Sequence, residues 1–289
     1  MIEREDKTAK DILGAIRIPS QPEVLLKIQG ELDKREPSLE FFTETIGSDI
    51  DISSAILRII NSSFYGLRSE VNSLHHAISL LGLVHIKNLL ATILFRRTME
   101  KEGFTPIPRY WDNATDVARL SGYLARQLGT APPDQAYTVG LFFDCGIPVM
   151  AQHFDNFKQV LSQQNQKQLK SYTQLEDQHF NTNHSVVGYY VTRSWGLPQV
   201  ILDACLLHHN IDYVKDEYTG ADPSCRNLVM ILKIAEHIAG SHRNDADYEW
   251  LRYQPHVLDN LGLSENDFGK LAADMRDILE NGATKGSFT

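Results

Sequence analysis

Apolar residues recur along most of this chain at the three- and four-residue spacing of amphipathic helices. The clearest example lies between residues 51 and 60, where the apolar positions are Ile52, Ala55, Ile56, Ile59 and Ile60. This spacing places all five side chains on one face of a helix. Strict alternation of apolar and polar residues, which is typical of half-buried strands, is not sustained anywhere in the sequence. The pattern therefore predicts an all-α protein.

Residues that favour helix ends lie where the helical pattern starts and stops. We expect Asp51 to cap the helix just described, because a short polar side chain can accept hydrogen bonds from the first free amides. Ser73 is expected to cap a short helix that ends at Gly82, a residue able to adopt a left-handed conformation. Ser264 and Asp267 have the spacing of a capping box before a final helix.

A proline-containing segment interrupts the helical pattern after residue 102. It holds Gly103, Pro106 and Pro108. Each proline lacks an N–H donor and disfavours helical conformation in the residue before it. We therefore expect two parts, an N-terminal helical subdomain over residues 1–103 and a second helical subdomain with the C-terminal helices over residues 104–289.

Composition and charge argue against nucleic acids and membranes as partners of this protein. The chain has a net charge of −9, whereas proteins that bind nucleic acids usually carry a basic balance. The first residues are charged and contain no apolar signal region, and no uninterrupted apolar run reaches the roughly 18 residues of a membrane span. Cys145, Cys205 and Cys225 are far apart and odd in number, as in reduced proteins. We expect a cytoplasmic protein without a nucleic-acid or membrane partner.

Histidines and carboxylates are the residues most able to carry chemistry. Asp144, His184, His208, His209 and Glu236 all lie in or beside expected helices. Neutral imidazoles and carboxylates are ligands for zinc, iron and manganese. Adjacent histidines diverge by about 100° on a straight helix, but at a helix end both can face one pocket. Each residue also has a structural explanation, such as a helix end or a favourable interaction with a helix dipole.

Several spaced motifs run through both halves of the chain. They are Ile18 to Pro22, Asp49 to Tyr65, Ser73 to Gly82, Tyr110-Trp111, Gly140 to Gly146, Glu176, His184 to Gly188, Trp195 to Pro198 and His208-His209. In this order and spacing the chain resembles the HDOD branch of the HD-type metal-dependent phosphohydrolases. The resemblance covers residues 18 to 239. It implies an N-terminal helical subdomain packed on an HD-like helical bundle, and a role in bacterial signal transduction.

Two residues depart from the pattern of an active HD enzyme. Asn113 stands where the resemblance places the first histidine ligand, and Phe143 replaces the histidine of the HD doublet. Asp144 is retained, and Glu236 stands about where the fold places its last aspartate. A phenyl ring cannot bind a metal and an amide oxygen is a poor replacement for imidazole, so metal binding should weaken. We therefore expect a degenerate metal site.

These departures favour a non-enzymatic regulatory module that acts on signalling proteins in trans through protein–protein contacts and requires no cofactor. Asp144, His184, His208 and His209 could still hold a residual divalent metal, or form a hydrogen-bonded polar cluster. The alternative is a metal-dependent phosphohydrolase or phosphodiesterase that acts on a nucleotide or cyclic dinucleotide with one metal in that site. A third hypothesis is a pocket that binds a nucleotide without cleaving it.

Overall fold

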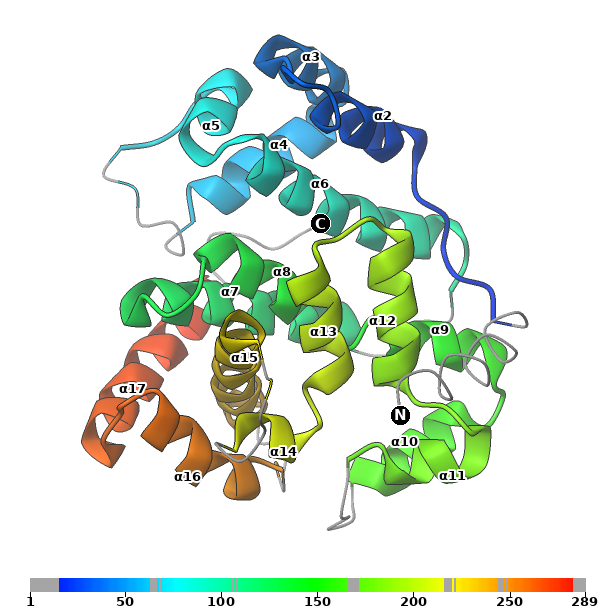
Figure 1. Ribbon diagram of the computed structural model, residues 1–289, viewed down its shortest axis with the longest axis vertical. Helices are drawn as coiled ribbons and strands as arrows, with labels where there is room; N and C mark the ends of the chain where they lie inside the picture. Colours follow the sequence, from blue (N-terminus) through cyan, green and yellow to red (C-terminus); the bar gives the residue numbers. More distant parts are fainter. Residues whose placement is uncertain are drawn as a thin grey trace.

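The structure is a computed structural model that describes residues 16–62, 67, 69–104, 107, 109–165, 172–215, 220, 222–243, 247 and 249–282. Within these residues it contains helices and no strand, so the all-α prediction is confirmed (Figure 1). The N-terminal helices are α2 (Glu23–Leu32), α3 (Leu39–Gly47), α4 (Ile50–Ile60), α5 (Leu74–Leu81) and α6 (Leu83–Lys101). The remaining helices are α7 (Tyr110–Leu128), α8 (Pro133–Phe142), α9 (Gly146–His153), α10 (Phe157–Asn165), α11 (Gln174–Phe180), α12 (His184–Ser194), α13 (Gln199–Leu207), α14 (Ile211–Val214), α15 (Pro223–His242), α16 (Trp250–Asn260) and α17 (Glu265–Gly282).

Helix α4 buries the apolar face that its sequence predicts, but it begins earlier than expected. All five apolar positions of the 51–60 pattern are buried. Asp49 caps the helix, because its Oδ1 accepts hydrogen bonds from the amides of Asp51 and Ile52 at 3.0 and 3.1 Å. Asp51 already lies inside the helix, so the expected cap was wrong by two residues. Arg97 of α6 pairs with the other oxygen of Asp49 at 2.6 Å and fixes the cap.

The other two predicted helix ends are confirmed. The hydroxyl of Ser73 accepts a hydrogen bond from the amide of His76 at 3.1 Å, and α5 ends at Gly82, which has a φ of 84°. A capping box joins Ser264 and Asp267, in which each backbone amide donates to the side chain of the other residue. These local hydrogen bonds satisfy amides that the helix itself leaves free.

The expected subdomain boundary falls between α6 and α7. Pro106 and Pro108, like the end of the motif at Ser63–Tyr65, lie outside the described residues. In Figure 1, α2 to α5 lie together at one end of the molecule, and α6 runs between them and the rest of the bundle. One connected apolar core extends through both parts. The division into two subdomains therefore stays a prediction.

Helix α12 connects the two parts of the molecule. Its C-cap, Trp195, is fully buried, and the indole Nε1 donates to the backbone oxygen of Pro19 at 3.0 Å. The same ring packs edge-on against Phe95 of α6, with ring centroids 5.2 Å apart. Lys87 of α6 donates to the backbone oxygen of Gly196. The C-terminal end of α12 is therefore attached both to α6 and to the segment before α2.

No single helix among the described residues combines the length and apolar character of a membrane span. Helices α5 and α6 meet that criterion only as a pair, and they are bent by 118° relative to each other.

Candidate metal centre

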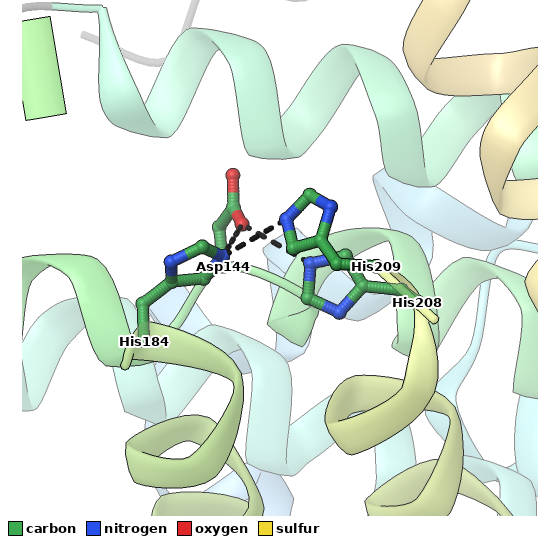
Figure 2. Close-up of side chains that lie close together, drawn as sticks. All are labelled: Asp144, His184, His208 and His209. Carbon is green, nitrogen blue, oxygen red and sulfur yellow. Dashed lines mark hydrogen bonds and ion pairs between the residues drawn. The ribbon is translucent and has the colours of Figure 1, made fainter. Parts of the chain in front are cut away.

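Three helix ends bring Asp144, His184, His208 and His209 together (Figure 2). Asp144 lies in the short connection between α8 and α9, and His184 is the first residue of α12. His208 is the C-cap of α13 and His209 follows it, so the turn at the helix end lets both adjacent rings face one place. The structure thus brings together the four residues that the sequence singled out as candidate ligands.

A close backbone approach sets the position of Asp144 relative to His184. A Cβ atom at Gly146, two residues after Asp144, would lie 2.0 Å from the backbone oxygen of His184. Only glycine allows the start of α9 to pack so closely against the start of α12. The start of α12 is itself fixed by Asn183, whose side-chain oxygen accepts a hydrogen bond from the amide of Val186 at 3.0 Å.

The distances within the group match a mononuclear metal site. Oδ1 of Asp144 lies 3.4 Å from Nε2 of His184 and 3.6 Å from Nε2 of His208. The Nε2 atoms of His184 and His209 are 3.0 Å apart, and all four ligand atoms lie within 4.8 Å of one another. Two ligands of a tetrahedral zinc ion, each about 2.1 Å from the metal, are about 3.4 Å apart. A divalent ion therefore fits among these atoms with small side-chain movements.

Glu176 orients the imidazole of His184. The carboxylate of Glu176 lies 2.8 and 2.9 Å from Nδ1 of His184 and accepts a hydrogen bond from its backbone amide at 2.7 Å. Both side chains are fully buried. A carboxylate on Nδ1 fixes the ring orientation and directs Nε2 toward a metal, which is a common arrangement around metal-binding histidines.

The other two histidines are held in the same way. Nδ1 of His208 donates to the backbone oxygen of Cys205 at 2.7 Å, and Nδ1 of His209 lies 2.8 Å from Oε2 of Glu249. All three imidazoles thus engage an acceptor through Nδ1 and turn Nε2 toward Asp144. This repeated geometry orients three nitrogen donors toward one point.

One donor atom of the group is buried without a hydrogen bond. Nε2 of His208 has no partner among the described residues, and its ring is fully buried. Because Nδ1 carries the proton that Cys205 accepts, Nε2 presents a lone pair. A buried lone pair without a partner costs free energy that a metal ion would recover. The residues present therefore fit a divalent metal.

The protonation states within the group follow from burial and neighbouring charges. Burial opposes a charge on His184, but the carboxylates of Glu176 and Asp144 outweigh it and raise its pKa to about 9. Burial, with the nearby ammonium of Lys233, lowers the pKa of His208 well below its usual range. Burial also raises the pKa of Asp144 to about 6. At neutral pH the group without a metal holds a protonated His184, a neutral His208 and an ionised Asp144.

A buried lysine beside the group was missed in the sequence. Nζ of Lys233 lies 2.7 Å from Oε2 of Glu249 and 2.9 Å from Oε2 of Glu236, and its side chain is 3% exposed. Glu236, the candidate pocket residue, is therefore paired with Lys233 and is not one of the four convergent ligands. The signal that could have identified Lys233 is its charge within the apolar run 228–239. Glu249 does not lie within an apolar run, so the sequence gave no comparable reason to single it out.

Asn113 and Phe143, which stand where the resemblance places histidine ligands, make contacts of their own. The fully buried ring of Phe143 packs edge-on against His208, with ring centroids 5.6 Å apart. The side-chain oxygen of Asn113 accepts a hydrogen bond from the guanidinium of Arg243, which also pairs with Asp116 at 3.1 Å. The Asn113 oxygen is thus part of a cluster with Arg243 and Asp116 between α7 and α15. The Phe143 ring forms an apolar wall beside the four candidate ligands.

A polar cavity of about 260 Å³ opens beside the group. Its lining includes His209, Thr173, Asn183, Ser185 and Asn210. The hydroxyl of Ser185 is buried and has no hydrogen-bond partner among the described residues. His209 thus belongs both to the lining of this cavity and to the candidate metal centre.

Comparison with known proteins identifies the family of the chain. A model of the HDOD domain matches residues 18–211. An uncharacterised protein of Treponema pallidum (strain Nichols) is 24% identical over 207 residues, which are 70% of this chain and 39% of that protein. The chain thus spans well under half the length of this curated relative.

Solved structures share the fold. An HDOD domain protein of unknown function from Geobacter sulfurreducens has a TM-score of 0.67 at 21% identity, covering 97% of this chain and 96% of its own. A candidate metal-dependent phosphohydrolase from Shewanella amazonensis has a TM-score of 0.63 at 16% identity, with 94% and 95% covered. A candidate signal transduction protein from Marinobacter aquaeolei has a TM-score of 0.63 at 20% identity, with 96% and 66% covered. The family model covers more than half of the chain, and the chain therefore belongs to the HDOD domain family.

Proposed function

We propose that this protein is a cytoplasmic regulatory HDOD module that binds one divalent metal ion and acts on signalling proteins in trans without hydrolysing a substrate. The observation that carries the proposal is the buried Nε2 of His208, which has no hydrogen-bond partner among the described residues and faces Asp144. With His184 and His209 oriented in the same way, four candidate ligand atoms converge on one place, which supports the proposal. The similarity in fold to a candidate signal transduction protein supports a role in signalling.

The candidate metal centre is placed where it can influence the rest of the molecule. A divalent ion in this site would supply two positive charges among buried carboxylates and would join the ends of three helices. His184 lies at one end of α12, and Trp195 at the other end donates to Pro19. In this proposal, a bound metal orders the His184 end of α12. The helix transmits this order to the N-terminal part of the chain, which binds the partner protein.

The alternative is a metal-dependent phosphohydrolase or phosphodiesterase that acts on a nucleotide or cyclic dinucleotide. It is favoured by the polar cavity that His209, a candidate ligand, helps to line. Two observations count against it. Phe143 offers no ligand atom, and the oxygen of Asn113 is engaged by Arg243. The same cavity also suits the third hypothesis, a nucleotide that is bound and not cleaved.

Calorimetric titration with Zn²⁺ and with Mn²⁺, together with amide hydrogen exchange, tests the proposal. We expect one ion per chain, loss of binding in His184→Ala, and unchanged binding in the exposed control His76→Ala. Metal should slow exchange in α12 and in the segment that contacts Trp195. Absence of binding in the wild-type protein, or binding that His184→Ala leaves unchanged, would contradict the proposed centre. If metal binds but amide hydrogen exchange changes only at the ligand residues themselves, the regulatory role would be contradicted.

A further inference from the structure

The aromatic ring of Tyr172, a residue that the sequence did not single out, lies against the candidate metal centre. This ring is stacked on the imidazole of His209, with centroids 4.5 Å apart and an angle of 22° between the planes. It is perpendicular to the imidazole of His184, with centroids 6.5 Å apart. Tyr172 thus lies beside two of the four candidate ligands.

The centroid distances show which side of His209 the ring of Tyr172 occupies. The centroids of His184 and His209 are 5.0 Å apart, and with Tyr172 they form a triangle that is nearly right-angled at His209. Nε2 of His209 points along the other arm of this angle, to within 3.0 Å of Nε2 of His184. A metal ion on Nε2 lies close to the plane of the imidazole, because the lone pair lies in that plane. Tyr172 would therefore flank a bound ion without replacing a ligand.

The hydroxyl end of Tyr172 lies in the field of the carboxylates around the site. Burial raises the pKa of Tyr172 well above its usual range, and the charges of Asp144, Glu236 and Glu249 raise it further. Among these carboxylates Asp144 acts most strongly, which agrees with a side chain that extends from His209 toward Asp144. The phenol is neutral at pH 7, so it adds no charge to the metal centre.

The candidate ligands are closed to solvent on most sides. The side chains of His184 and His208 are fully buried, that of His209 is 5% exposed and that of Asp144 is 17% exposed. Solvent therefore reaches the group mainly beside Asp144. Tyr172 is half-buried, with one face of its ring on His209 and part of its surface in solvent. A residue placed in this way separates the ligands from solvent.

We propose that Tyr172 shields the bound metal ion, because its ring covers the coordination position that the four protein ligands leave free. A zinc-like ion with four ligands can accept a fifth, and metal-assisted hydrolysis requires that water or substrate reach the ion. The shield keeps anions in solution from that position, which accounts for a centre that holds a metal without hydrolysing a substrate. The inference deepens the proposed function and rests on it, since it requires a metal ion in the site.

Cobalt-substituted protein tests the shield on the full chain by a spectroscopic signature. The visible absorption of Co²⁺ changes when azide adds to its coordination sphere. We expect azide to change the spectrum of Tyr172→Ala at concentrations at least about tenfold below any effect on the wild type. Tyr172→Phe keeps the ring and should resist azide like the wild type. The matched control is Tyr189→Ala, which removes a half-buried tyrosine ring from α12 and should also resist azide.

The outcomes distinguish a failure of the shield from a failure of the metal centre. If the wild type gives no spectrum of bound Co²⁺, both the proposed function and the shield are overturned. If Co²⁺ binds and azide acts equally on the wild type and on Tyr172→Ala, or on neither, the shield alone is overturned. The same conclusion holds if Tyr172→Phe is as sensitive to azide as Tyr172→Ala. Circular dichroism and Tm are recorded for every variant, and Tyr172→Val, which also lacks the ring, replaces Tyr172→Ala if the latter unfolds.

Discussion

The Nε2 atoms of His184 and His209 lie 3.0 Å apart inside a buried site. Two neutral imidazoles that both presented a lone pair at this distance would repel each other, so in the absence of metal a proton lies between them. His184 carries that proton, because Glu176 and Asp144 raise its pKa to about 9 despite its burial. A divalent ion and this proton compete for the same place.

The competition predicts how metal affinity depends on pH. Between about pH 7 and pH 9 the protonated His184 must lose one proton for metal to bind, so the apparent Kd should fall about tenfold per pH unit as pH rises. Below about pH 6, Asp144 is protonated as well, and the slope should approach a hundredfold per unit. Titrations at several pH values in two buffers of different ionisation enthalpy measure both the slope and the released proton. A Kd that stays constant from pH 6 to pH 9 would show that His184 does not hold the proton.

The raised pKa of His184 also links the stability of the metal-free protein to pH. Its pKa is about 9 in the folded state against an ordinary value of 6.5. The stabilising contribution is therefore complete below about pH 6.5 and is lost as pH rises through about 9. We expect the free energy of unfolding of the metal-free protein to fall across this range, and to fall less in Glu176→Gln. Urea unfolding at pH 6.5, 8 and 9.5 checks the expectation, and equal losses in both proteins would contradict it.

Above about pH 9, where His184 has already lost the competing proton, Glu176→Gln should weaken metal binding about 10- to 100-fold. Glutamine keeps one acceptor oxygen, whereas Glu176 accepts from both the amide and the ring of His184. The lost carboxylate also lowers the pKa of His184, so the pH dependence of binding should shift to lower pH. Calorimetric titration compares this variant with Glu44→Gln, an exposed control on α3. A weaker affinity without a shift in the pH profile would indicate a purely structural effect.

The four candidate ligands of the metal centre could be proposed from the sequence because each lies within one of the spaced motifs that carry the family resemblance. Lys233 and Glu249 could not, because their roles depend on packing between distant helices. Glu249 contacts His209 across 40 residues, and Asn113 meets Arg243 across 130. No local pattern encodes such pairs, since the sequence does not say which helices will face each other.

Lys233→Met should destabilise the protein by about 3–5 kcal/mol, because it leaves the buried Glu249 and the partly buried Glu236 without their cation. The matched control is Lys215→Met, which breaks a more exposed pair with Asp212 and should cost at most about 1 kcal/mol. Urea unfolding of both variants gives the comparison. If both variants lose the same small amount of unfolding free energy, the carboxylates near Lys233 take up protons when the lysine is removed.

Phe143→His tests whether Phe143 alone accounts for the absence of hydrolysis that we propose. A buried imidazole in place of this ring should lower stability by about 1–3 kcal/mol in the metal-free protein. We expect no hydrolysis, because Asn113 remains engaged by Arg243 and offers no imidazole. Metal-dependent turnover in Phe143→His alone would show that the contact between Asn113 and Arg243 does not limit the site.

The limits of local sequence patterns also appear in the fold. Asp49 and Asp51 both carry a carboxylate near the start of α4, and the prediction from the sequence placed the cap at Asp51. The structure selects Asp49, whose second oxygen is held by Arg97, 48 residues away. The apolar face of α4 was predictable in full because periodicity is local, whereas the choice of cap depends on a contact with another helix.

We propose that the module holds a metal ion without the chemistry of a hydrolase. This is tested by assaying hydrolysis of a cyclic dinucleotide and of a nucleoside triphosphate by protein loaded with Zn²⁺ or Mn²⁺, with the products followed by liquid chromatography. We predict no product above the background of metal alone. The contradicting result is metal-dependent hydrolysis that disappears in Asp144→Ala while circular dichroism shows an intact fold. The fold must be checked because loss of a buried carboxylate can itself cost about 1–3 kcal/mol.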